Sequence, residues 1–211
     1  MKTNLIIIGA GNVGAFIAYN LPLFKGEYNL MGFLDDDSEK RGKFLAGYKV
    51  LGNIELLNDL PTNIAVAVGV ASPIVRKKIL ENIKPKGFYF PNFVASGSWI
   101  SNAVSVGKGL IIYPGVSVNY ESKIGDFVII NMNCGIGHNT TISDYCTLAP
   151  GVNTAGFTYL EECVDAGIGA STRQNVRIGK NSVIGGQAMV IADVPENSVA
   201  IGVPAVVKSK M

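Results

Sequence analysis

The fold is decided by the stretch IGDFVIINMNCGIGHNTTI, residues 124–142, in which every sixth residue is isoleucine. Outward from it, the same spacing runs without a slip from Ile100 to Val190, and thirteen of its sixteen positions hold Ile, Leu or Val. A period of six suits neither an α-helix nor a flat sheet. It is typical of a parallel β-helix, in which each hexapeptide forms one side of a triangular coil.

A second track of small or apolar residues lies two positions before the first, for example at Val128, Cys134 and Thr140. Residues two apart on a strand share a face, so both tracks are predicted to point inward. Three hexapeptides complete a turn, which predicts about five coils stacked roughly 4.8 Å apart. A β-sandwich is the alternative, but it has no reason to hold one six-residue register for so long.

Composition points to a soluble protein with a large core. The 211 residues are 48% hydrophobic and 16% charged, with a net charge of +2 and no basic run. We therefore expect no nucleic-acid partner, no membrane insertion and a cytoplasmic location. Cys134 and Cys146 lie on the inward track and are expected to be small core residues, whereas Cys163 lacks an obvious partner. The absence of a CxxC pair argues against a metal site.

The first 95 residues follow a different pattern. Short apolar runs predict strands, and helical periodicity lies between them, with Ile74, Ile79, Leu80 and Ile83 on one side of the second helix. The expected strands cover 5–8, 30–34, 64–68 and 87–93, and the expected helices cover 15–21 and 73–83. Alternating strands and helices predict a parallel α/β sheet. We expect an α/β half-Rossmann domain over 1–95 and an all-β parallel β-helix with a C-terminal cap over 96–211.

A glycine-rich turn, Gly9-Ala10-Gly11-Asn12-Val13-Gly14, joins the first strand to the first helix, and Asp35 ends the second strand. Such a turn lets a phosphate approach the backbone at a helix N-terminus, and the aspartate is spaced to meet a ribose hydroxyl. The lobe is short for an intact NAD fold. A nucleotide site is therefore favoured over NAD and over a tight turn that binds nothing.

The whole chain resembles one family, the sugar acetyltransferases of the sialic acid O-acetyltransferase type, through the strand-GAGxxG-helix, the FLDDD segment, the third strand ending in Gly69 and the hexapeptides. Well-known members N-acetylate nucleotide-linked 4-amino-4,6-dideoxy sugars. The resemblance implies a left-handed β-helix and a homotrimer. It also implies a nucleotide-linked amino sugar in the N-terminal lobe and acetyl-CoA in the groove between neighbouring solenoids.

His138 is the only histidine in the chain and follows the inward Ile136 by two residues, which places it at an outward-facing corner. Neutral imidazole can take the proton of an attacking amine or hydroxyl near neutral pH. The alternative is a surface histidine without a role. The resemblance implies a catalytic base at His138, with Asn139 standing where family members carry Asp or Glu.

The resemblance implies further site residues. On the nucleotide-sugar side they are Gly9, Gly11, Gly14, Asp35, Asp36, Gly69 and Asn131. On the acetyl-CoA side they are Thr147, at the place of a second family histidine, and Gly156 and Gly186, whose amides would meet the pantetheine arm. Solenoid corner geometry is the alternative role of the last two glycines.

The predicted function is acetyl-CoA-dependent N-acetylation of a nucleotide-linked amino sugar for surface glycan synthesis, by direct attack and without a metal. The alternative within enzymes is O-acetylation of a sialic acid-type sugar. A degenerate, non-catalytic binding protein is the alternative from another class, because Asn139 and Thr147 replace the usual side chains. Binding measurements with the candidate ligands would discriminate these three functions.

Overall fold

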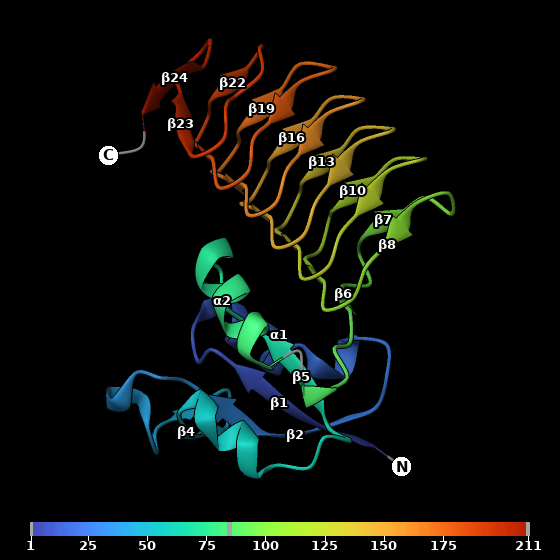
Figure 1. Ribbon diagram of the computed structural model, residues 1–211. Helices are drawn as coiled ribbons and strands as arrows, with labels where there is room; N and C mark the ends of the chain where they lie inside the picture. The colour runs from blue at the N-terminus through green and yellow to red at the C-terminus, as the bar shows by residue number, and fades with distance from the viewer. Residues whose placement is uncertain (1, 84–85, 210–211) are drawn as a thin grey trace.

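The computed structural model describes residues 2–83 and 86–209. It consists of a small α/β lobe and a solenoid of stacked coils that lies above the lobe in Figure 1. The two sequence patterns correspond to these two parts.

The lobe is built on one five-stranded sheet with the strand order β3-β4-β2-β1-β5. Its strands are β1 (Thr3–Ile8), β2 (Tyr28–Leu34), β3 (Phe44–Leu45), β4 (Tyr48–Gly52) and β5 (Ala65–Val68). Central β1 pairs in parallel with both β2 and β5, as its continuous apolar run predicts. The expectation of a fourth strand over 87–93 is wrong, because Tyr89 makes only an isolated bridge to Ala65.

Two α-helices cover the sheet, α1 (Asn12–Tyr19) and α2 (Pro73–Ile83). Three short 3₁₀ helices complete the lobe: η1 (Leu21–Leu23), η2 (Ser38–Lys40) and η3 (Ile54–Asp59). Helix α1 packs with Leu5 and Ile7, and α2 packs with the opposite face of β1. The expectation that Ile74 lies on the buried side of α2 is wrong. Ile74 is 52% exposed because α2 turns Arg76 toward the solenoid instead.

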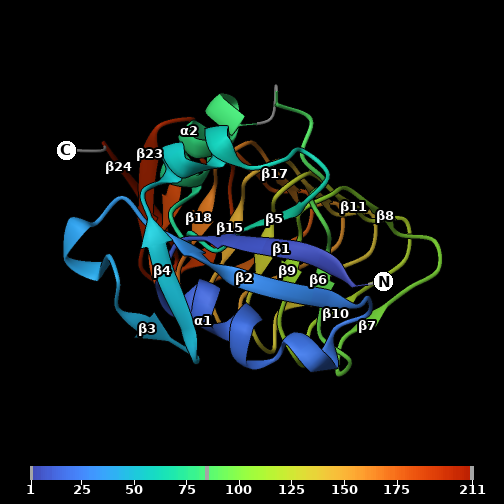
Figure 2. The same cartoon turned by 90° about the horizontal axis from the view of Figure 1, so that it is seen from below.

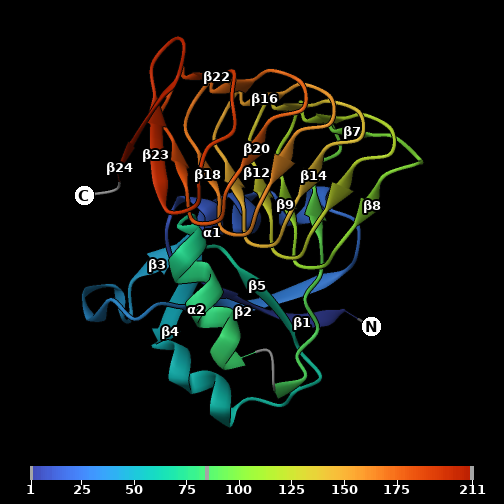
Figure 3. The same cartoon turned by 45° about the horizontal axis from the view of Figure 1, so that its top comes forward.

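The solenoid has three faces, and the strands of successive coils pair in parallel within each face (Figure 3). Face 1 holds β6 (Phe93–Val94), β9 (Ile111–Ile112), β12 (Ile129–Ile130), β15 (Thr147–Leu148), β18 (Asp165–Ala166), β21 (Val183–Ile184), β23 (Ser198–Ile201) and β24 (Val206–Ser209). Face 2 holds β7 (Trp99–Ile100), β10 (Ser117–Val118), β13 (Gly135–Ile136), β16 (Asn153–Thr154), β19 (Ser171–Thr172) and β22 (Met189–Val190). Face 3 holds β8 (Ser105–Val106), β11 (Lys123–Ile124), β14 (Thr141–Ile142), β17 (Tyr159–Leu160) and β20 (Arg177–Ile178).

Both six-residue tracks point into the solenoid, as predicted. They form one core in which residues such as Ile130, Ile136, Cys134 and Cys146 are at most 3% exposed. Val106 is an exception on the aliphatic track and is 47% exposed, because it lies in the first coil, where no preceding coil covers it. The antiparallel hairpin of β23 and β24 lies at the opposite end of face 1.

The corners turn through residues with positive φ, which recur at six-residue spacing. Many are glycine or asparagine, such as Asn133 and Asn139, which accept this conformation readily. Others, including Glu121, Phe127 and Tyr145, are types for which it is unfavourable. The geometry of the coil therefore sets the positive φ at these corners, whichever residue stands there.

The lobe sits on face 1, and Figure 2 shows its sheet in front of the coils of that face. Ile111 and Ile129 of face 1 join the cluster around α1, while Phe127 and Tyr145 join the cluster around α2. Phe127 and Tyr145 stack with ring centroids 5.9 Å apart. The lobe and the solenoid are therefore joined by apolar packing on both sides of the lobe sheet.

Candidate functional site

A cavity of about 420 Å³ opens at the carboxyl ends of β1, β2 and β5. It is lined by five of the predicted residues: Gly9, Gly11, Asp35, Asp36 and Gly69. A ligand site is expected at this edge of a parallel α/β sheet. The structure therefore brings together most of the predicted nucleotide-sugar residues.

The glycines of the turn have different roles. A Cβ on Gly14 would lie 2.0 Å from the carbonyl oxygen of Gly9, and a Cβ on Gly69 would lie 2.7 Å from Cα of Gly14. Gly9 has a φ of +94°. These three glycines allow the strand and helix to pack closely. A Cβ on Gly11 would meet nothing within 4 Å, so Gly11 is the glycine that leaves space for a ligand.

Asp35 organises the wall of this cavity. Its carboxylate accepts hydrogen bonds from the Ala10 amide at 2.8 Å, from the Asp37 amide at 3.0 Å and from Lys40 Nζ at 2.9 Å. Burial raises the pKa of Asp35, but the hydrogen bonds from Lys40, Asp37 and Ala10 outweigh it and hold this pKa below its ordinary value. Asp36 accepts from the Ile54 amide at 2.9 Å and fixes the neighbouring loop.

Lys40 lies in the same wall and was not predicted. Asp35 holds the Lys40 ammonium group at the edge of the cavity. The N-terminus of α1 lines the same cavity. A lysine and a helix N-terminus both favour an anion. The sequence signal was its position, five residues after Asp35 in a segment rich in charged residues.

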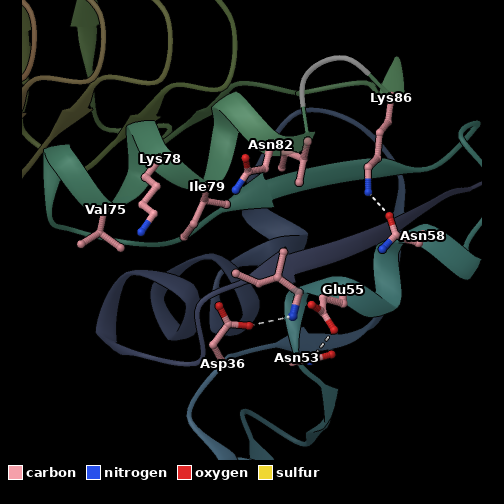
Figure 4. Close-up of a pocket in the computed structure, with 11 residues that line it drawn as sticks. Asp36, Asn53, Glu55, Asn58, Val75, Lys78, Ile79, Asn82 and Lys86 are labelled. Carbon is pink, nitrogen blue, oxygen red and sulfur yellow. Dashed lines mark hydrogen bonds between the residues drawn. The ribbon is translucent and has the colours of Figure 1, made fainter.

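A larger cavity of about 630 Å³ adjoins the first and shares Asp36, Ile54, Val75 and Ile79 with it. Figure 4 shows side chains of α2, including Lys78 and Asn82, projecting toward the loops on the other side. Asn58 accepts a hydrogen bond from Lys86 on that side. The two cavities together offer phosphate-binding cations and amide groups that can pair with a base or sugar.

His138 lies on the other side of the solenoid, at the corner between faces 2 and 3. Its ring stacks on Tyr120, with centroids 5.3 Å apart and planes at 10°, and Phe157 meets it edge-on at 5.1 Å. A Cβ on Gly156 would lie 2.6 Å from Cε1 of His138, so Gly156 leaves room for the ring. The imidazole is thus held in one orientation by residues of three successive coils.

His138 Nδ1 lies 2.9 Å from Asn139 Oδ1, and Asn139 Nδ2 donates to Glu121 Oε2 at 2.6 Å. Neither Glu121 nor the two aromatic neighbours was predicted. The signal was available, because Glu121 precedes Asn139 by 18 residues, which is one coil. Within the described residues, no hydrogen bond involves His138 Nε2.

The remaining predicted residues lie elsewhere on the chain. Asn131 and Gly186 are at the corner between faces 1 and 2, where Asn131 Oδ1 accepts from the Met132 amide. Thr147 lies on face 1, is 8% exposed and donates to the carbonyl of Ala71, which lines the lobe cavity. Within one chain the structure does not bring these residues to His138.

Arg76 was missed by the sequence analysis. It is 1% exposed and donates to the carbonyls of Val70, Phe127 and Tyr145, among others, and to Thr147 Oγ1 at 3.0 Å. Burial lowers its pKa to about 10, so the guanidinium stays charged at neutral pH. It ties α2 to two coils beside the lobe cavity.

The three cysteines are buried and free. Burial raises the pKa of Cys134 to about 11 and that of Cys146 to about 12, and it also raises the pKa of Cys163. None is suited to act as a thiolate nucleophile. Across residues 2–83 and 86–209, no side-chain group suited to a metal ion is found. Nor does this part of the chain contain a helix that is long and apolar enough to cross a membrane.

Comparisons with known proteins match both parts of the chain. Residues 4–83 match the PglD N-terminal domain, and residues 121–156 match the bacterial transferase hexapeptide repeats. A GDP-perosamine N-acetyltransferase of Escherichia coli O157:H7 is 28% identical over 178 residues, which is 81% of this chain and 78% of the relative.

Two solved structures resemble the chain over nearly its full length, each with 26% identity. One is PerB from Caulobacter crescentus in complex with CoA and GDP-perosamine, with a TM-score of 0.88 and 99% of each chain covered. The other is the acetyltransferase domain of PglB from Neisseria gonorrhoeae in complex with acetyl coenzyme A, with a TM-score of 0.87 and 98% and 99% covered.

The fold and the repeats define a hexapeptide-repeat acyltransferase with a left-handed β-helix, which confirms the predicted fold class. With its PglD-type N-terminal domain, the chain belongs to the sugar acetyltransferase family.

Proposed function

We propose that the chain transfers an acetyl group from acetyl-CoA to the amino group of a nucleotide-linked sugar. The lobe cavity carries this proposal, because the open face of Gly11, the N-terminus of α1 and Lys40 meet at one wall. Such a wall suits a diphosphate. The related proteins that bind GDP-perosamine and CoA support the same substrate pair.

His138 is the proposed general base. Its Nδ1 is engaged by Asn139, so Nε2 is the nitrogen that can accept a proton. In the proposed reaction the sugar nitrogen attacks the thioester carbonyl and forms the new C–N bond, while its proton passes to Nε2. The C–S bond breaks, and the departing CoA sulfur takes up the proton that His138 Nε2 accepted. The buried cysteines favour this direct transfer over an acyl-cysteine intermediate.

The proposed active site needs a second copy of the chain. The lobe cavity belongs to the side of face 1, and His138 is at the corner opposite that face. One chain therefore cannot place both groups on one substrate. Around His138 the large side chains of Tyr120 and Phe157 are 48% and 52% exposed, which suits burial against a neighbour. We propose a homotrimer with three shared sites.

The test is an acetyl-transfer assay with acetyl-CoA and GDP-, UDP- and dTDP-linked amino sugars, read by CoA thiol release and product mass. We expect acetylation of at least one amino sugar and none of its hydroxyl counterpart. Transfer to the hydroxyl sugar alone would favour the O-acetyltransferase. No transfer and no thermal shift with any pair would contradict the proposed function. Sedimentation showing a stable monomer at micromolar concentration would contradict the shared site.

A further inference from the structure

We propose that Glu121 is a positioning residue that acts on His138 through Asn139. Its carboxylate fixes the tautomer of the imidazole and stabilises the ring once it is protonated. The inference rests on the proposed function only for its kinetic consequence, because the hydrogen-bonded chain itself is a property of the protein without substrate.

The direction of the hydrogen bonds follows from the chemistry of the three groups. An ionised carboxylate only accepts, so the side-chain nitrogen of Asn139 must face Glu121, at 2.6 Å. The amide oxygen must then face His138 Nδ1, at 2.9 Å, and it too only accepts. Nδ1 therefore carries the hydrogen, and Nε2 is the basic nitrogen.

The geometry of the coil sets the backbone conformation at Glu121. Its φ is +56°, a conformation that asparagine takes at the equivalent corner one coil further on, at Asn139 (φ +57°). Phe157, one further coil along, has the same positive φ (+58°), so the corner itself holds this conformation and fixes where the Glu121 side chain leaves the backbone. The observed contact of Glu121 is the one with Asn139, which in turn holds the histidine.

The surroundings of the ring leave Glu121 as its source of negative charge. Tyr120 and Phe157 contact the two sides of the imidazole, and Gly156 lies against its edge. None of these three residues carries a carboxylate. Among the described contacts of the corner, a carboxylate reaches the imidazole only through Asn139.

The first experiment follows the imidazole by NMR. Because His138 is the only histidine, tag-free protein labelled in histidine gives one imidazole titration without further assignment. Glu121→Gln keeps an oxygen that can accept from Asn139 but removes the charge. We expect the titration midpoint to fall by about 0.5 pH unit, as a carboxylate at this separation near the surface would produce. Glu196→Gln is the control, because it makes the same charge change in the ion pair with Lys180, and it should leave the titration midpoint of His138 unchanged.

The second experiment moves the charge along the chain of contacts. Asn139→Asp alone would place two carboxylates where Nδ2 and Oε2 now meet, so it is combined with Glu121→Gln. In the double variant the new glutamine amide donates to the new aspartate, which directly contacts Nδ1. The midpoint should return to the wild-type value or exceed it. The acidic limb of the kcat profile should move in the same direction as the midpoint in each variant, with KM unchanged.

An unchanged midpoint in Glu121→Gln, or a double variant that stays as low as Glu121→Gln, would overturn the inference. Failure of the proposed function is separable from this. If the midpoints shift as expected but no amino sugar is acetylated, then the positioning role of Glu121 stands and the acetyltransferase assignment falls. If acetylation occurs and neither midpoint nor acidic limb responds, the positioning role falls alone.

Discussion

The imidazole of His138 lies directly against Gly156, where a Cβ would come within 2.6 Å of Cε1 and 2.7 Å of Nε2. Gly156 has no positive φ, so its backbone accepts alanine. The requirement for glycine therefore comes from the ring one coil away, and not from the backbone geometry of the corner.

Gly156→Ala should displace the ring and lower kcat by about tenfold or more, up to the roughly 10²–10⁴-fold loss expected when a general base is removed. The KM for acetyl-CoA and the melting temperature should hold. Steady-state kinetics with acetyl-CoA varied is the measurement. A raised KM with kcat intact would instead indicate that Gly156 contacts the pantetheine arm.

His138→Ala should lower kcat by roughly 10²–10⁴-fold, or about 3–5 kcal/mol of barrier. The melting temperature should change little, because the ring lies at a corner outside the solenoid core. Activity of the wild-type enzyme should fall at acidic pH, since protonated imidazole cannot act as a base. Near-native turnover by His138→Ala would mean that the amine arrives deprotonated and that the site only positions it.

Gly11→Val should abolish binding of the nucleotide sugar while acetyl-CoA binding and stability hold, because a side chain there enters the cavity and touches no protein atom within 4 Å of its Cβ. Gly14→Ala is the matched control. Its Cβ would collide with the Gly9 carbonyl, so it should lower the free energy of unfolding by about 1–3 kcal/mol. Calorimetric titration and denaturant melts measure both. Equal loss of both ligands in Gly11→Val would make the turn purely structural.

Arg76→Met should lower the free energy of unfolding by about 2–4 kcal/mol, since it removes the buried, charged donor that bonds to the carbonyls of Phe127 and Tyr145. Lys77→Met is the control on the same helix. It removes a half-exposed ion pair with Glu162, and such pairs contribute about 0.2–1 kcal/mol. Urea melts compare the two variants, and equal effects would show that Arg76 does not tie the lobe to the solenoid.

The three thiols should resist Ellman's reagent in the native protein and react fully in denaturant. Burial raises the pKa of each, so the thiolate fraction near neutral pH is very small and reagent access is blocked. Absorbance of the released thionitrobenzoate counts the reactive thiols. Rapid reaction of one native thiol would reopen an acyl-cysteine pathway.

The repetitive part of the fold follows from sequence because a six-residue register constrains every coil through the same core. The positions of Ile136 and Cys134 could be predicted without any long-range information. The buried side of α2 could not, because it is decided by carbonyls that the distant Phe127 and Tyr145 present to Arg76. Periodicity therefore predicted an apolar side that included Ile74, which is exposed.

Candidate site residues on the glycine turn could be proposed from the sequence because their chemistry is local. Residues that act across coils were harder to find from a linear motif. Glu121 is adjacent to Asn139 only when the chain is wound at one coil per 18 residues. Thr147 could be placed on its face by counting, but its contact with Ala71 depends on how the lobe docks.

Arg76 bonds to the same corner position on two successive coils, at Phe127 and Tyr145. Every coil presents a carbonyl there, so these two bonds depend on the spacing between successive coils and not on which coils are bonded. The hydrogen bond to the Thr147 side chain is specific to one coil. A whole coil gained after Cys163, beyond the residues that pack against the lobe, would thus lengthen the protein and leave the lobe and His138 in place. A coil gained between Phe127 and Tyr145 would break the clamp. Length variation in this architecture should accordingly be tolerated at the C-terminal end of the solenoid and excluded from the coils that the lobe covers.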